Sequence, residues 1–240
     1  MWSICKKELN QFFSNLTGYI AIVMFLLING IFLFVLQDSS IFEFGYASLD
    51  NFFALAPWVL MFLVPAISMR SLSDEFKAGT FEILKTRPLS ASQIVWGKYL
   101  SILLVLLFVI VPTFIYIITI KTLSTTGNID TGGISGSYLG LFLLAAVYTG
   151  ISLCCSSLTS NAVVAFLISA FSCLVLYFGF NALSKLAFLA NGPDYYIEML
   201  GIDFHYRSIS RGVLDSRDLV YFISVILLFL LITIKNLHKK

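Results

Sequence analysis

The sequence predicts an all-α integral membrane protein. Of the 240 residues, 59% are hydrophobic and only 12% are charged, and the mean hydropathy is +0.93. A soluble domain carries about 25% charged residues. The apolar residues come in blocks close to the roughly 20 residues that a helix needs to cross the hydrocarbon layer. Six such blocks predict six transmembrane helices within a single domain, residues 1–240, at about 18–36, 52–69, 99–120, 138–158, 162–183 and 219–234.

Residues 2–16, ahead of the first span, are predicted to form an interfacial helix. Apolar residues recur there at three- or four-residue spacing, with Lys6, Lys7, Asn10 and Gln11 between them. An apolar stripe beside a basic face suits a helix that lies in the headgroup plane. A plain positively charged leader to the first span is the alternative. The apolar run that follows is too long for a cleavable signal peptide.

The second span is the weakest, because Pro57 and Pro65 interrupt it. Membrane helices tolerate proline where neighbouring groups satisfy the freed carbonyls. We expect this span to continue as a helix to about Lys77, ahead of a break at Gly79. Capping boxes are predicted for Ser71 with Asp74, and for Ser90 with Gln93 where the third span begins.

The polar segment 70–98 is far longer than a turn requires. A short helix is predicted at 80–86, ending before Pro88. Because seven residues do not form a stable helix alone in water, its apolar residues Phe81 and Leu84 need something to pack against. The segment therefore indicates a docking surface for another protein, and an amphipathic piece resting on lipid is the alternative.

The later connections differ in length. Residues 121–137 are rich in Gly, Ser and Thr and predict a flexible outer turn. Gly136 and Gly140 have the spacing of a helix-packing motif, although loop glycines are an equal alternative. A short inner hairpin is predicted between the fourth and fifth spans, drawing on these residues: Ser152, Ser156, Ser157, Thr159, Ser160 and Asn161.

The outer segment, 184–218, is too long for a turn and is apolar, so we expect it to dip into the membrane edge. A first helix is predicted from Pro193 to about Gly201, and a second through 207–211 that stops at Gly212. Asp215 and Asp218 are expected to cap the entry to the last span.

The distribution of Lys and Arg predicts the orientation. With both termini and residues 70–98 in the cytoplasm, that side holds ten of the fifteen basic residues: Lys6, Lys7, Arg70, Lys77, Lys85, Arg87, Lys98, Lys235, Lys239 and Lys240. The other side holds five: Lys121, Lys185, Arg207, Arg211 and Arg217. An even number of spans with both ends inside satisfies this bias.

No motif for catalysis is present. The sequence lacks a phosphate-binding GxxxxGK[ST] loop, HExxH, a paired-cysteine zinc motif and a GxSxG elbow. The four cysteines predict small apolar fillers with no disulfide and no metal site. His205 is expected to be a structural hydrogen-bonder at the outer interface rather than an acid–base group.

No ionisable residue lies in the middle of a span, which argues against an ion-coupled pump. Four lysines at span ends are expected to snorkel to the interface: Lys98, Lys121, Lys185 and Lys235. The chain is therefore predicted to be a membrane component driven by something else.

Residues 74–90, DEFKAGTFEILKTRPLS, resemble the E…GT-x-E-x-L-x-T-x-P-x-S signature of ABC-2-type permeases. Six spans, an interfacial helix and re-entrant helices before the last span are also the pattern of that family. In it, the signature forms a coupling helix that docks onto a separate ATPase subunit. The run FHYRSISRGVLDSRDLVYF, residues 204–222, resembles the gliding-motility-associated (GldF-type) permeases and their relatives in copper-processing and lipid-export operons.

The resemblance implies a bacterial inner-membrane permease subunit, not itself an enzyme. It implies two permease subunits, identical or homologous, that face each other and meet a cytoplasmic ABC ATPase dimer. ATP and Mg²⁺ would be bound by that dimer and no cofactor by this chain; membrane lipids are the other expected partners, and nucleic acid is not. The implied docking residues are Glu75, Gly79, Thr80, Phe81, Glu82, Leu84 and Pro88. The outer segment contributes His205, Arg207, Arg211, Gly212 and Asp215.

Two function classes stay open at this point. One is a transporter subunit that exports a polymer, a lipid or another hydrophobic substrate. The other is a non-transporting relay or scaffold that acts on a periplasmic partner through the outer segment. A secondary transporter is disfavoured, because the sequence shows neither self-similar halves nor a charge at mid-membrane.

Overall fold

The computed structural model describes residues 1–36, 48–82, 90–123, 130–186 and 193–239. Within these ranges the chain is helical and contains no strand, which confirms the predicted fold class. The elements are α1 (Trp2–Ser14), α2 (Leu16–Phe34), α3 (Asp50–Ser68), α4 (Arg70–Lys77), α6 (Ala91–Ile110), η1 (Val111–Thr113), α7 (Phe114–Leu123), α8 (Thr131–Leu158), α9 (Ala162–Leu174), η2 (Val175–Gly179), α10 (Phe180–Ser184), α11 (Pro193–Glu198), α12 (Ile202–Ile209) and α13 (Ser216–Lys239).

The described helices include five segments long and apolar enough to cross a membrane. These are Asp50–Lys77, Ala91–Leu123, Thr131–Leu158, Ala162–Ser184 and Ser216–His238. A sixth candidate is the pair α1 and α2, which passes the same test together but is bent by 70°. The sequence placed the first span on α2 and separated it from α1 as an interfacial helix.

The outer turn predicted at 121–137 is wrong at both ends. Helix α7 runs to Leu123, and α8 begins at Thr131; residues 124–129 lie outside the described residues. Asp130 is the reason for the early start of α8, because its Oδ1 accepts a hydrogen bond from the Gly133 N–H at 2.9 Å and so satisfies a free helix-end donor.

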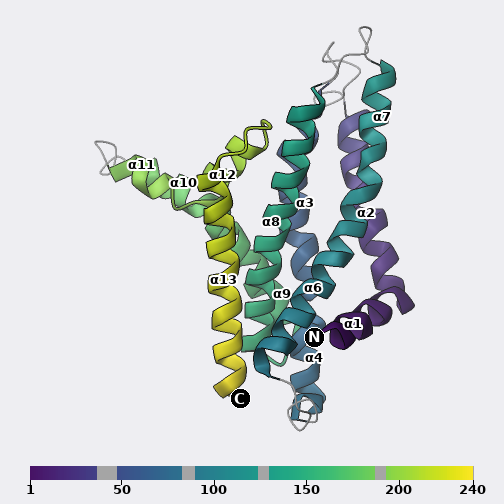
Figure 1. Ribbon diagram of the computed structural model, residues 1–240, viewed down its shortest axis with the longest axis vertical. Coiled ribbons are helices and arrows are strands. Elements are labelled where there is room, and N and C mark those ends of the chain that lie inside the picture. Colours follow the sequence, from purple (N-terminus) through teal and green to yellow (C-terminus); the bar gives the residue numbers. More distant parts are fainter. Residues whose placement is uncertain (37–47, 83–89, 124–129, 187–192, 240) are drawn as a thin grey trace.

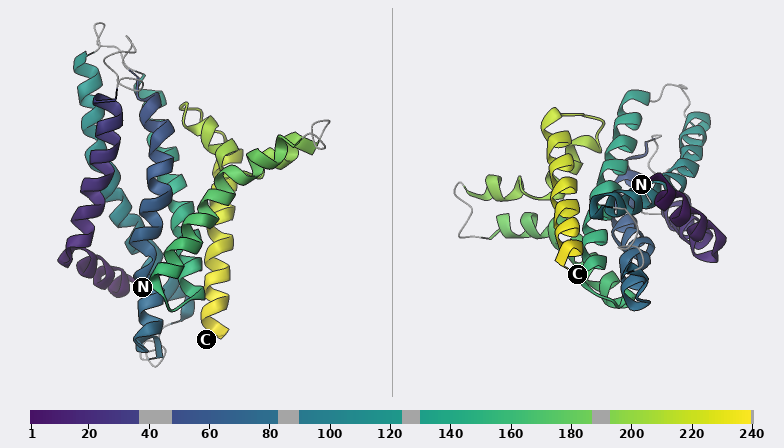
Figure 2. Two further views of the ribbon diagram at one scale, coloured as in Figure 1. Left: turned by 180° about the vertical axis from the view of Figure 1, so that it is seen from behind. Right: turned by 60° about the horizontal axis from the view of Figure 1, so that its bottom comes forward.

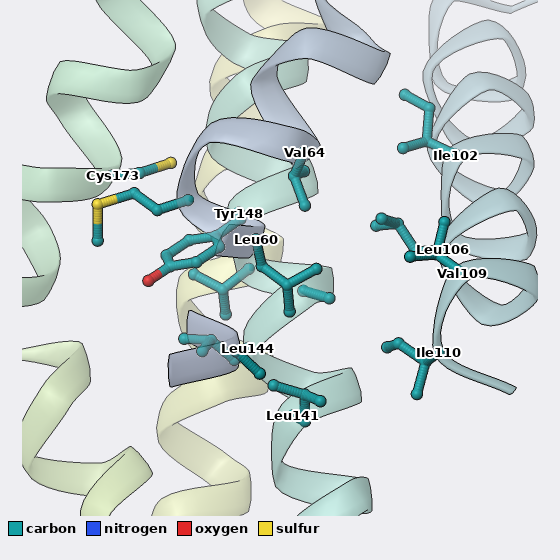
Figure 3. Packing of buried hydrophobic residues seen from close by; sticks show 14 of the residues in the cluster. Leu60, Val64, Ile102, Leu106, Val109, Ile110, Leu141, Leu144, Tyr148 and Cys173 are labelled. Atoms are coloured by element: carbon teal, nitrogen blue, oxygen red, sulfur yellow. The ribbon is translucent and has the colours of Figure 1, made fainter. Parts of the chain in front are cut away.

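Helix α8 is the centre of the bundle, with α3, α6, α9, α12 and α13 packed around it (Figure 1). In the most apolar 18-residue window of α8, 83% of the residues are buried inside the protein. The corresponding windows of the last two spans, Ala162–Ser184 and Ser216–His238, are each 22% buried. Figure 3 shows the core, where Leu60 and Val64 of α3 and Leu106 of α6 point toward Tyr148 of α8.

Three serines assigned to the inner hairpin lie instead within α8 and are buried: Ser152, Ser156 and Ser157. The hairpin itself is confined to residues 159–161, where Asn161 Oδ1 caps α9 by accepting from the Val163 N–H at 3.0 Å. A helix can hold such hydroxyls because they bond to its own carbonyls, as Ser157 Oγ does to the Cys154 oxygen at 2.6 Å.

The two ends of the bundle are different. Helix α4 and both chain termini lie toward one end, called the α4 end here (Figure 1). Toward the opposite end, α10 and α11 project from one side of the bundle (Figure 2). Helix α2 runs along the other side of the bundle, and α1 lies beside it at the α4 end (Figure 1). The four cysteines are buried and unpaired.

Candidate functional site

The junction of α3 and α4 at Met69 lies at the α4 end. Helix α3 stops at Ser68 and α4 starts at Arg70, and the two together form one candidate span, Asp50–Lys77. Ser156 of α8 fastens this junction, because its Oγ donates to the Met69 carbonyl oxygen at 3.0 Å and accepts from the N–H groups of Leu72 and Ser73, each at 3.2 Å. The predicted capping box of Ser71 with Asp74 is wrong, because the backbone at Met69 is already helical and the Ser71 hydroxyl has no hydrogen-bond partner among the described residues.

Gly79 reverses the chain at the tip of α4. The Ala78 N–H bonds to the Asp74 carbonyl, and Gly79 follows with φ +67°, a conformation that other residues rarely adopt. Residues 80–82 are again helical. Thr80 Oγ1 donates to the Glu75 carbonyl at 3.4 Å and ties this turn back to α4.

Phe81 points back to the protein. Its ring packs edge-on against Phe76 of α4 with ring centroids 5.0 Å apart, and the residue is 5% exposed. Gly79, Thr80 and Glu82 are exposed. The turn therefore presents a polar outer surface on a hydrophobic support. The remaining predicted docking residues, Leu84 and Pro88, lie outside the described residues.

Behind this turn lies the Lys98 cluster, which consists of Glu8, Ser71, Glu75 and Lys98. Lys98 Nζ donates to Glu75 Oε1 at 2.8 Å, to Glu8 Oε1 at 2.9 Å and to the Ser71 carbonyl oxygen at 2.6 Å. An ammonium has three N–H donors, and all three are used. The Lys98 side chain is 1% exposed, and those of Glu8 and Glu75 are 18% and 15% exposed.

The expectation that Lys98 snorkels to the interface is therefore wrong. Lysine snorkels when water is the best partner within reach, but here two carboxylates and a carbonyl surround the ammonium. The cluster joins α1, α4 and α6 at one point. Sequence reasoning did not include Glu8, although it is the single acid on a helix that also carries Lys6 and Lys7.

Helix α1 packs against α6 on the face that carries Glu8. Ile4 and Cys5 are buried there, and Ile4 Cβ lies 3.0 Å from the position that a Cβ on Gly97 would occupy. Burial, followed by the charge of Glu8, raises the pKa of the Cys5 thiol. Trp2 and Leu16 of the predicted apolar stripe are 68% and 73% exposed, so they are left for lipid rather than for the bundle.

The outer segment is tied to the last span through His205. Its Nδ1 lies 2.6 Å from Asp218 Oδ1, its Nε2 lies 2.9 Å from the Met199 carbonyl oxygen, and its ring stacks on Tyr221 at 3.9 Å. His205 is 3% exposed and both of its ring nitrogens have hydrogen-bond partners, as a structural hydrogen-bonder requires, and this role stays a prediction. Asp218 is thus engaged by His205, whereas Asp215 Oδ1 accepts from the Arg217 N–H at 3.0 Å and takes the capping role.

Arg207 organises the opposite face of α12. One guanidinium nitrogen lies 2.7 Å from both Glu198 Oε1 and Asp203 Oδ2. Partial burial lowers the pKa of this guanidinium, but Asp203 and Glu198 more than reverse that effect and leave it raised. The second outer helix was placed too late, because α12 spans Ile202–Ile209; Arg211 follows it and is exposed.

Gly212 ends the outer segment against α8. It has φ +82°, and Gly133 approaches so closely that a Cβ on Gly212 has no room. Its carbonyl oxygen lies 3.0 Å from where a Cβ on Gly136 would be, and Ile209 fills the space beside Gly140. Of the two alternatives for Gly136 and Gly140, the structure supports close helix packing.

The described residues contain no group of three or more His, Cys, Asp or Glu side chains placed to hold a metal ion. The α4 end combines three features: a continuous helical rod, a turn at Gly79 and a buried ionic cluster. A family model described as "ABC-2 family transporter protein" matches residues 2–234.

The chain belongs to the ABC-2 transporter family.

Membership in the ABC-2 family makes this chain a membrane component of an ABC transporter, not its ATPase, and implies association with an ABC ATPase. A search of curated proteins finds no significant match. The apolar helices and the family together establish a multi-pass membrane protein.

Proposed function

We propose that this ABC-2 protein is the permease subunit through which a separate ATPase dimer drives export across a bacterial inner membrane. The α4 end faces the cytoplasm, with both termini, and two permease subunits, identical or homologous, pair in the membrane. ATP and Mg²⁺ bind to the ATPase. The run at 204–222 supports a finer assignment to the gliding-motility-associated subfamily.

The excess of basic residues supports this orientation. Ten of the fifteen Lys and Arg residues belong to the termini and to residues 70–98, and cytoplasmic segments carry such an excess. The two termini lie toward the α4 end, in agreement with an even number of crossings (Figure 1).

One observation carries the coupling role: the Lys98 cluster lies directly behind the exposed turn at 79–82. Thr80 bonds to the Glu75 carbonyl, and the Glu75 carboxylate bonds to Lys98. A push on the turn is therefore transmitted through α4 to α6 and α1, rather than absorbed by a mobile loop. Glu82 is exposed on this turn and is suited to contact a partner.

The experiment is co-purification with candidate ATPases encoded beside this chain, using wild type, Glu82→Lys and Asp74→Lys. The two variants make the same change in charge at the same end of the protein. Asp74 is exposed too, but it lies within α4 rather than on the turn at 79–82. We expect Glu82→Lys to lose the ATPase and Asp74→Lys to retain it.

Loss of the ATPase in both variants would indicate a general charge effect and reject docking by the turn. Failure of the wild type to bind any ATPase would reject the permease role itself.

A second candidate is the non-transporting relay, and the outer segment favours it. Residues Tyr195, Tyr196 and Leu200 are 57%, 72% and 58% exposed on an arm that projects from the bundle (Figure 2). The arm is firmly connected, because Tyr206 donates to the Phe53 carbonyl at 2.8 Å and Ser137 to the Ser210 carbonyl at 2.9 Å. Under this hypothesis, a variant without residues 193–200 no longer acts on its periplasmic partner but still binds the ATPase.

A further inference from the structure

A cavity of about 430 Å³, called the polar chamber here because charged residues line part of it, lies between α1, α3, α4 and α6; apolar residues line the rest. Its charged lining residues are Lys7, Glu8, Arg70, Asp74 and Glu75. Lys7, Arg70 and Asp74 are exposed, so their charged groups are free to meet a ligand. Glu8 and Glu75 each direct one carboxylate oxygen to Lys98 behind them.

A second hollow of about 630 Å³ lies between α2 and α3, with Phe166 of α9 at one edge. Every residue that lines it is apolar. Along α3 and the residue that follows it, the lining runs from Trp58 to Met69. At 1.5 Å per residue this length is roughly 16 Å, which is about half the thickness of the hydrocarbon layer. The hollow therefore has the length of one acyl chain in one leaflet.

The two hollows adjoin. Four residues line both of them: Phe12, Ala66, Ile67 and Met69. A polar chamber thus opens directly into an apolar groove, at the level where the interfacial helix α1 meets α2. This order of polar and apolar surface matches a lipid, with its headgroup beside α1 and its chain along α3. A protein helix in the groove would leave the polar chamber without a matching partner.

The charges select among headgroups. The lining itself carries two cations (Lys7 and Arg70) and three carboxylates (Glu8, Asp74 and Glu75), and the buried Lys98 behind it supplies the third cation. The lining and Lys98 together are balanced, which gives a singly charged anion no net attraction. This balance suits a headgroup that brings both signs, with a phosphate near Lys7 and Arg70 and an ammonium near Asp74.

We propose that α1, α2, α3 and α4 hold one zwitterionic phospholipid, of the phosphate-and-ammonium class, from the leaflet in which α1 lies. The site belongs to a single chain and does not require the ATPase or a known substrate. When this lipid site is occupied, the position of α1 relative to α4 depends on the lipid that surrounds the protein.

The test is native mass spectrometry of the purified chain in detergent, with phosphatidylethanolamine or phosphatidylglycerol of identical acyl chains added. Ala66→Trp fills the junction of the two hollows, since Ala66 is exposed and lines both. Its control is Leu231→Trp on α13, where the residue is 64% exposed to lipid outside both hollows. Lys7→Gln tests the headgroup contact, and its neighbour Lys6→Gln, which does not line the cavity, is the control.

We expect one phosphatidylethanolamine retained by the wild type and by both controls. Ala66→Trp and Lys7→Gln should each weaken retention by roughly tenfold or more, equivalent to about 1.4 kcal/mol. Preference for phosphatidylglycerol would overturn the charge argument, and equal retention by Ala66→Trp would overturn the site. Dissociation of a dimer by Ala66→Trp without a change in bound lipid would assign the groove to a second copy instead. Because no ATPase is present, these outcomes are independent of the proposed function.

Discussion

Replacing Lys98 with methionine tests the central tie of the α4 end. Methionine keeps the length and most of the apolar stem of lysine but removes the ammonium, which leaves the carboxylates of Glu8 and Glu75 facing each other without a cation. Both side chains are less than one-fifth exposed. Removing one partner of a buried ion pair costs about 3–5 kcal/mol. For a chain of this size, 1 kcal/mol corresponds to a shift in Tm of about 2–4 °C.

We therefore expect Lys98→Met to lower Tm by roughly 6–20 °C, measured by differential scanning fluorimetry in detergent. The control is Lys121→Met, which changes an exposed lysine at the far end of the same span. The triple variant Lys98→Met with Glu8→Gln and Glu75→Gln should recover most of the loss, because it removes the uncompensated charges. Equal Tm values for Lys98→Met and Lys121→Met would refute the buried tie.

Three further predictions follow from other contacts. Ser156→Ala removes three hydrogen bonds at the junction of α3 and α4 and should cost about 1–3 kcal/mol, seen as a lower Tm and faster proteolysis near Met69. Unchanged Tm and proteolysis would show that these hydrogen bonds do not stabilise the junction. Gly212→Ala should destabilise by at least about 1 kcal/mol, whereas Gly132→Ala, which has no backbone strain, should not; similar Tm values would contradict the close contact with Gly133. In a variant whose other three cysteines are replaced, Cys5 should react with maleimide only at a higher pH than an exposed thiol does, because burial and then the charge of Glu8 raise the pKa of its thiol. Labelling of Cys5 at the pH at which exposed thiols react would show that α1 is detached from α6.

The sequence predicts local features of this fold well. Apolar runs long enough to cross a membrane identify the spans, and the capping box of Ser90 with Gln93 is formed as predicted. Both features depend on interactions between residues that are close together in the sequence, so the sequence pattern alone is sufficient to predict them. The end of α8 at Leu158 agrees with the predicted fourth span, but its start was missed, because Asp130 caps a glycine-rich stretch that packs on Gly212, far away in sequence.

The candidate site was predicted only in part, because its contacts join distant segments. Lys98 lies at the edge of an apolar run, a position where lysine normally reaches water, and nothing near it in sequence indicates two acidic partners. Glu8 lies 90 residues away and Ser156 lies 87 residues from Met69. A useful signal was present all the same: one acid stands on an otherwise basic interfacial helix, and one lysine stands at the beginning of a strongly apolar span.

The Lys98 cluster also has a consequence for biogenesis. Glu8 leaves the ribosome 90 residues before Lys98, and at roughly 5–20 residues per second the interval is on the order of 5–20 s. During that time α1 has a carboxylate without its cation, so burying its inner face against the membrane core is unfavourable. The amino-terminal helix should therefore remain at the membrane surface while the first two spans insert, and it should dock only when the third span arrives.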